Sequence, residues 1–164
     1  RIVWRMNDVS RLITHSSLGV DLSDTEVEVL GSLMVERQLE DGEFLFEDGT
    51  NDDSLHVILM GKLEVVKRTG GDDYSSLAVL RDGELAGELS FIDGALHTVG
   101  LRALCETHVL SLSREAFEGI VDSNPQLVYK VMRAVARSAH RIVHRMNTEF
   151  VELSNYIFKQ HGRY

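Results

Sequence analysis

A glycine-rich segment, residues 83–98, holds the side chains of this chain that are best placed to do chemistry. It reads as the end of a strand, a turn, one short helical turn and the start of another strand. A glycine at the start of a helical turn lets backbone N–H groups approach an anionic oxygen, and the turn's positive end favours negative charge. Glu88 lies in that turn, where its carboxylate is a poor phosphate ligand but a good acceptor for a ribose hydroxyl. The segment therefore indicates a binding site for a sugar phosphate.

The same residues resemble a known family. Gly87-Glu88-Leu89-Ser90, with a polar pair following Gly94, is similar to the phosphate-binding cassette of cyclic-nucleotide-binding domains. These are the sensor modules of the cAMP receptor protein and of protein kinase A regulatory subunits. Upstream, residues 41–49 and 54–65 resemble the glycine-punctuated β-roll of that family, and the resemblance runs from about residue 22 to about residue 146.

The resemblance implies a ligand and the residues that hold it. The ligand would be a cyclic nucleotide such as cAMP or cGMP, with no further cofactor and no metal, and the last helix would move to cap its base. The residues implied in ligand binding are Gly87, Glu88, Leu89 and Ser90 around the sugar phosphate, and His97 and Thr98 where the phosphate partners stand.

His97 is the main departure from the family, because that position is normally an arginine that forks onto the cyclic phosphate. Arginine offers five donors and a permanent charge, whereas neutral histidine offers one donor. Losing a charge-assisted bidentate contact removes about 1.5–3 kcal/mol, roughly a ten- to hundredfold drop in affinity. If His97 contacts a phosphate, we expect affinity to strengthen as the pH falls toward 6, since a bound anion favours imidazolium. The other interpretation is a packed or exposed strand histidine that remained after ligand binding was lost.

Other groupings of reactive side chains predict little. His140 and His144 have the spacing of two metal ligands on a helix, but the sequence identifies no third ligand. No Ser, His or Asp spacing implies a nucleophile and its base, so we expect no enzyme activity. Arg133, Arg137, Arg141 and Arg145 recur every four residues and form one helix stripe. The stripe is interpreted as a solvated face or a strip against the acidic body, with an acidic protein partner or an unconventional phosphate contact as the alternatives.

Charge and composition set the broad class. The 164 residues carry a net charge of −9 and are 43% hydrophobic, ordinary for one globular domain with an appendage. Residues 1–123 hold 10 Lys and Arg against 24 Asp and Glu, whereas residues 124–164 hold 7 against 2. The acidic body argues against nonspecific nucleic-acid binding.

No export or membrane pattern is present, and the single Cys105, predicted to be a small core residue, fits a reducing cytoplasm. The start at Arg1 predicts a piece of a longer protein.

Periodicity predicts an α+β fold: an antiparallel, jelly-roll-like β-roll flanked by N-terminal helices and a long C-terminal helix. Residues 1–21 form a helical segment, with an apolar face that includes Ile2, Val3 and Trp4, and Ser23 with Glu26 predicts a capping box for the next helix. Residues 22–123 hold the roll, where apolar residues alternate with a period of two between glycine turns. Two of those turns are predicted at Asp82-Gly83 and at Met60-Gly61-Lys62.

Residues 124–164 predict a long helix that serves as lid and dimerisation element, with Pro125 at its first position. Its apolar residues step by a mean of 3.75, nearer a straight helix than a sustained coiled coil: Leu127, Val131, Val135, Ser138, Ile142, Met146, Phe150, Leu153 and Ile157. A homodimer through this helix is therefore plausible, and no helix-turn-helix pattern follows it, so we expect no direct DNA binding. Two alternatives stay open: a ligand-free structural or dimerisation domain, or the regulatory part of a larger transcription regulator, enzyme or transporter.

Overall fold

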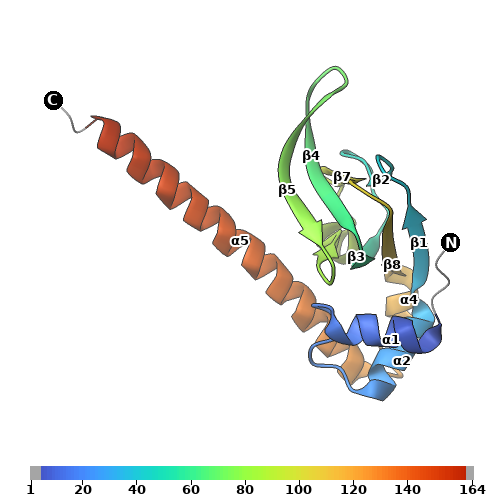
Figure 1. The fold of residues 1–164 in the computed structure, drawn as a ribbon. Coiled ribbons are helices and arrows are strands. Elements are labelled where there is room, and N and C mark those ends of the chain that lie inside the picture. The colour runs from blue at the N-terminus through green and yellow to red at the C-terminus, as the bar shows by residue number, and fades with distance from the viewer. Residues whose placement is uncertain (1–4, 162–164) are drawn as a thin grey trace.

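The computed structural model describes residues 5–161, apart from the side chains of Met6, Gln160 and His161. Helices come first, short strands with one helical turn among them follow, and a long helix comes last, as the sequence predicts (Figure 1). The elements are α1 (Met6–His15), α2 (Asp24–Leu33), β1 (Val35–Leu39), β2 (Phe44–Phe46), β3 (Ser54–Met60), β4 (Lys62–Gly70), β5 (Asp73–Arg81), β6 (Leu85–Ala86), α3 (Glu88–Asp93), β7 (Gly100–Ala103), β8 (Thr107–Ser113), α4 (Arg114–Glu118) and α5 (Pro125–His161).

The strands pair into two four-stranded antiparallel sheets, with the orders β1-β8-β3-β6 and β2-β7-β4-β5. In the first sheet β3 pairs with β8 from Ser54–Ser113 to Met60–His108, and in the second β4 pairs with both β5 and β7. The predicted antiparallel roll in an α+β fold is therefore confirmed. Because β6 is the edge strand that pairs with β3, the cassette that follows β6 lies at this edge of the first sheet.

Two hydrophobic clusters account for the distribution of apolar residues along the strands. One cluster lies between the sheets and contains Ile58 of β3 with Leu63 of β4. The other lies between the first sheet and the helices, where Leu55 and Val57 of β3 pack with residues of α2, α3 and α5. Successive side chains of a strand point to opposite faces, and both faces of β3 are covered, so this strand is apolar apart from Ser54 and His56.

One predicted turn is present, and one residue that was predicted to lie in the core lies in a turn instead. Gly61 joins β3 to β4 with φ +115°, and a Cβ there would lie 2.4 Å from the Thr107 hydroxyl oxygen, so the predicted tight connection needs glycine. The prediction that Cys105 lies in the core is wrong. Cys105 is exposed, because it lies in the turn between β7 and β8 rather than in the strand continued from Ala103.

The N-terminal helices pack as amphipathic elements. Ser23 caps α2 by accepting from the Glu26 N–H at 3.2 Å, while the Glu26 carboxylate accepts from the Ser23 N–H at 3.0 Å, which confirms the capping box. Ile13 of α1 is fully buried. Ile2, Val3 and Trp4, also assigned to this apolar face, lie outside the described residues.

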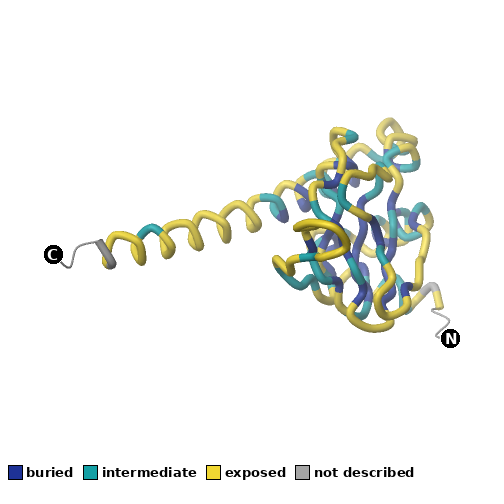
Figure 2. The backbone as a smooth tube through the Cα atoms, turned by 90° about the horizontal axis from the view of Figure 1, so that it is seen from above, coloured by how far each residue is buried: buried dark blue, intermediate teal, exposed yellow. Residues whose placement is uncertain are grey.

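Helix α5 has two parts with different surroundings. Its first turns are buried against the body through Leu127, Val131 and Val135, after a start at Pro125 as predicted. The rest projects away from the body, with exposed residues along most of its length (Figure 2). The apolar stripe continues into this exposed part, where Phe150 is 69% accessible. Among the described residues, no helix is long and apolar enough to cross a membrane.

Candidate functional site

The cassette turn is built around Gly87, which precedes α3 in the left-handed region with φ +81°. A Cβ at this position would lie 2.6 Å from the Ser54 carbonyl oxygen and 3.2 Å from Cδ2 of His56. Both the positive φ and the close approach therefore require glycine. Gly94, with φ +68°, ends the same helical turn. The strand, turn and short helix predicted for this segment are present, but the strand predicted to begin within it starts only at Gly100, so His97 and Thr98 lie in the connection before β7.

The Glu88 carboxylate points toward α5. Its Oε1 accepts a hydrogen bond of 2.9 Å from the hydroxyl of Ser138, a buried residue of that helix. Burial raises the pKa of the Glu88 carboxyl, and its own backbone N–H, Ser138 and the charge of His56 offset only part of this rise. A half-buried acceptor that carries charge at a cost is suited to receive a further hydroxyl donor.

The next cassette residues divide between surface and interior. Leu89 is 62% exposed, whereas the buried Ser90 hydroxyl donates to Oδ1 of Asn51 at 2.6 Å and accepts from the Asp53 N–H at 3.2 Å. The Asn51 amide also donates to the Gly94 carbonyl at 2.6 Å. The side chain of Ser90 thus fastens the cassette to the loop before β3.

His97 lies in the interior and is 7% exposed. Its ring stacks on Phe46 with centroids 3.5 Å apart, and its Nε2 lies 3.1 Å from Oδ1 of Asp52. The following Thr98 is exposed, and its carbonyl accepts from the Lys67 ammonium at 2.6 Å. In this structure, the donor of His97 is therefore directed at a carboxylate of the chain itself.

Asp52 bridges two histidines, an arrangement that sequence reasoning missed. Its second oxygen, Oδ2, lies 2.6 Å from Nε2 of the buried His56, whose Nδ1 lies 2.7 Å from the Ser111 hydroxyl oxygen. Burial acts to raise the pKa of the Asp52 carboxyl, but His56, the Ser54 backbone and His97 outweigh it and lower the pKa to about 2. Asp52 is therefore ionised near neutral pH. A histidine inside an otherwise apolar strand, four residues after an aspartate, was the available signal.

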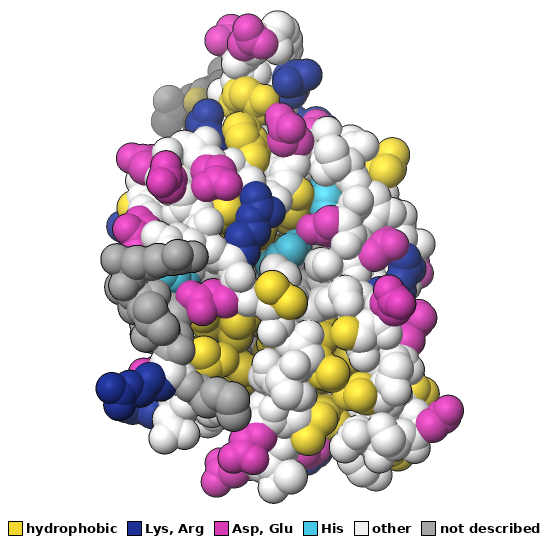
Figure 3. All heavy atoms as spheres, turned by 90° about the vertical axis from the view of Figure 1, so that its right-hand side faces the viewer, with side chains coloured by type: hydrophobic (Ala, Val, Ile, Leu, Met, Phe, Trp, Pro, Cys, Tyr) yellow, Lys and Arg dark blue, Asp and Glu magenta, His cyan; other side chains and the backbone are white. Residues whose placement is uncertain are grey.

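The arginine stripe on α5 divides along its length. Arg137 pairs with Asp21 at 2.8 Å, and this contact lowers the pKa of the Asp21 carboxyl. This part of the stripe lies against the acidic body, one of the arrangements predicted for it. Arg141 and Arg145 line a cavity instead, together with Ser138. Acidic side chains also spread over the face viewed in Figure 3, where basic ones are fewer.

The described part of the chain contains no group of three or more His, Cys, Asp or Glu side chains arranged to hold a metal ion. His140 and His144 lie on adjacent turns of α5 with ring centroids 6.5 Å apart.

Residues 36–124 match the profile of the family described as the cyclic nucleotide-binding domain, which is more than half of the chain. The chain belongs to this family. The matched residues of this cyclic nucleotide-binding domain include the cassette, His97 and Asp52, and they end before α5 begins.

The chain is similar to three proteins of larger size. Thermus thermophilus catabolite activator protein superposes with a TM-score of 0.72 at 27% identity, covering 85% of this chain and 63% of that one. A CRP-like cAMP-activated global transcriptional regulator of Mycobacterium tuberculosis is 25% identical over 61% of this chain and 45% of its own length. An uncharacterized NTE family protein of the same organism is 26% identical over 81% of this chain. The chain spans only 22% of that protein.

Proposed function

We propose that this cyclic nucleotide-binding domain is a ligand-sensing module that binds a cyclic nucleotide such as cAMP or cGMP and has no catalytic activity. One observation carries the proposal: a half-buried carboxylate, Glu88, follows a left-handed Gly87 that brings backbone and strand β3 together. The similarity to a mycobacterial regulator described as cAMP-activated supports the same ligand class. The acidic body supports a role without direct DNA contact.

Glu88 also supplies a route from ligand to helix. A ribose hydroxyl that donates to Oε1 of Glu88 competes with the Ser138 hydroxyl, which donates to that oxygen in this structure. Binding at that oxygen therefore changes the contact between α5 and the cassette. A ligand shifts a conformational equilibrium only if it interacts differently with the two states, and this competition provides such a difference.

His97 defines how the phosphate is recognised. Its Nε2 faces Asp52, so a cyclic phosphate must compete with Asp52 for that donor. If the cyclic phosphate displaces Asp52 from His97, the affinity for the cyclic nucleotide strengthens as the pH falls toward 6, because the bound phosphate anion favours imidazolium. A titration of cAMP and cGMP affinity from pH 6 to pH 8 tests this point, and a flat profile removes His97 from the binding site.

The function itself is tested by thermal unfolding and calorimetry with cAMP and cGMP. A ligand at one hundred times its Kd adds about 2.7 kcal/mol to the free energy of unfolding. Glu88→Ala should abolish most of this stabilisation, whereas Glu40→Ala, which removes an exposed carboxylate far from the cassette, should preserve it. No stabilisation of the wild-type protein by any cyclic nucleotide would refute the sensor function.

A second candidate is a ligand-free dimerisation domain, and the exposed stripe of α5 favours it. Ile142, Met146, Phe150 and Leu153 are all exposed along the part of the helix that projects from the body. A second copy of this helix would cover them, in a symmetric homodimer. The larger relatives also suggest that either module regulates a longer protein. Light scattering on the purified protein measures the mass and tests the dimer.

A further inference from the structure

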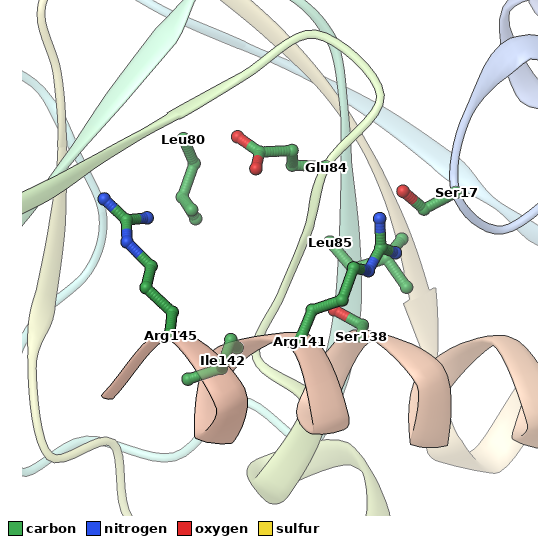
Figure 4. Close-up of a pocket in the computed structure, with 8 residues that line it drawn as sticks. All are labelled: Ser17, Leu80, Glu84, Leu85, Ser138, Arg141, Ile142 and Arg145. Atoms are coloured by element: carbon green, nitrogen blue, oxygen red, sulfur yellow. The ribbon is translucent and has the colours of Figure 1, made fainter. Parts of the chain in front are cut away.

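A cavity lies between α5 and the turn that joins β5 to β6, beside the cassette. Figure 4 shows the side chain of Arg145 extending from α5 toward Leu80 and that of Arg141 extending toward Leu85 and Ser17, with Ser138 on the same helix. The cavity volume is about 120 Å³. Ser138 belongs both to this lining and to the contact with Glu88, so the cavity and the cassette share one hydroxyl.

The charges around the cavity leave a positive excess. Among the described residues, Arg141 forms no ion pair, while Arg145 lies 3.5 Å from Glu149 with both side chains about two-thirds exposed. An exposed pair of this kind is weak, so Arg145 is readily redirected. Glu84 is the one carboxylate in the lining, and it accepts from the Arg81 N–H at 2.6 Å. The lining therefore holds two guanidinium groups and one carboxylate, and that carboxylate is already hydrogen-bonded.

The rest of the lining suits an anion of limited size. The hydroxyl of Ser17 adds a donor, and Leu80, Leu85 and Ile142 add apolar walls. The single proton of the Ser138 hydroxyl is already donated to Glu88. About 120 Å³ corresponds to roughly four water molecules at about 30 Å³ each, well below the roughly 300 Å³ of a pocket for a whole drug-sized ligand. The space matches one tetrahedral oxyanion.

We propose that this cavity binds a phosphate-class oxyanion, held by the guanidinium groups of Arg141 and Arg145 beside the Ser17 hydroxyl. Guanidinium groups bind phosphate oxygens through paired charge-assisted hydrogen bonds, and they need no proton from solution to do so. An occupant held by Arg141 and Ser17 links α5 to the loop that follows α1, so it favours the helix position in which Ser138 caps Glu88. The site does not depend on cyclic-nucleotide binding at the cassette.

The test is calorimetric titration of the purified chain with inorganic phosphate at low ionic strength. Arg141→Gln should weaken binding about tenfold, and the double variant with Arg145→Gln should weaken it further. Arg133→Gln is the matched control, since Arg133 is exposed on the same helix but lies outside the cavity, and its binding should stay within about twofold of wild type. Circular dichroism and the Tm verify that each variant folds, which is expected for exposed helix positions.

Two outcomes overturn the site: wild-type protein that does not bind phosphate at millimolar concentration, or equal loss in Arg141→Gln and Arg133→Gln. A cAMP arm then distinguishes the source of the anion. If cAMP displaces inorganic phosphate and loses affinity in Arg141→Gln, the nucleotide's own phosphate uses the site. If cAMP binding is absent or unchanged in Arg141→Gln while phosphate binding is lost, the occupant is a separate phosphate-class anion.

Discussion

Replacing Glu88 by Gln tests whether the cassette carboxylate is held in its charged form at a cost. Burial raises the pKa of Glu88, so in the wild-type protein its contribution to stability is present below its ordinary pKa of 4.5 and is lost as the pH rises through the raised value. Gln keeps an acceptor for the Ser138 hydroxyl and carries no charge. We therefore expect Glu88→Gln to raise the free energy of unfolding at pH 7.5 by up to about 1 kcal/mol, which is roughly 2–4 °C in Tm.

The same variant should bind a ribose hydroxyl less well. A neutral acceptor replaces a charged one, which weakens a hydrogen bond by about 1 kcal/mol, or about five- to tenfold in cyclic-nucleotide affinity. Glu88→Gln should thus raise the free energy of unfolding while lowering the ligand affinity. A substitution that merely disturbed the structure would lower both.

Urea unfolding at pH 7.5 and pH 4 measures the stability effect, with Glu40→Gln as the control for relief of the net negative charge, since Glu40 is exposed. The gain of Glu88→Gln over this control should shrink at pH 4, where the wild-type carboxyl is protonated. Lower stability of Glu88→Gln than of the control at pH 7.5, or a difference that does not change with pH, would refute the reasoning.

Three further predictions follow from the site and from α5. Asp52→Asn should lower the free energy of unfolding by about 1–3 kcal/mol at pH 7, because it weakens two contacts to buried histidines. This difference from wild type should fade as the pH drops from 3.8 to about 2, where Asp52 itself loses its charge. Equal urea midpoints of the two proteins at pH 7 would contradict this prediction. His97→Arg should strengthen cyclic-nucleotide binding about tenfold by calorimetry, and unchanged affinity would show that this position does not reach the phosphate. Met146→Lys with Phe150→Lys should convert a dimer to a monomer in light scattering while leaving the Tm of the body nearly unchanged, since both side chains are exposed; an unchanged mass would exclude this stripe as the interface.

Local chemistry made much of this fold predictable from sequence. The capping box at Ser23 and Glu26 involves residues three apart, and the tight turn at Gly61 depends on one backbone conformation. The apolar stripe of α5 is likewise a pattern within a single helix. In each case the residues that decide the structure are close in sequence, so propensity and periodicity suffice.

The contacts that define the candidate site are long-range, and this is why sequence reasoning did not find them. Ser138 and Glu88 are fifty residues apart, and His97 and Asp52 forty-five. The pairing depends on how α5 and the loops pack on the first sheet, which no local pattern encodes. The prediction that Cys105 is buried was wrong for a related reason. Its neighbours in sequence are apolar, but Cys105 lies in the turn after a strand has ended.

Helix α5 is continuous from Pro125 to His161, so the residue that touches Glu88 and the apolar stripe near the chain's end belong to one rigid rod. From Ser138 to the end of the helix is about 23 residues, or about 35 Å at 1.5 Å per residue. A tilt of about 10° at the cassette would displace the tip by about 6 Å over such a length. If the proposed ligand displaced Ser138 from Glu88, a change of atomic size at the cassette would become a displacement of several ångströms at the tip of the helix.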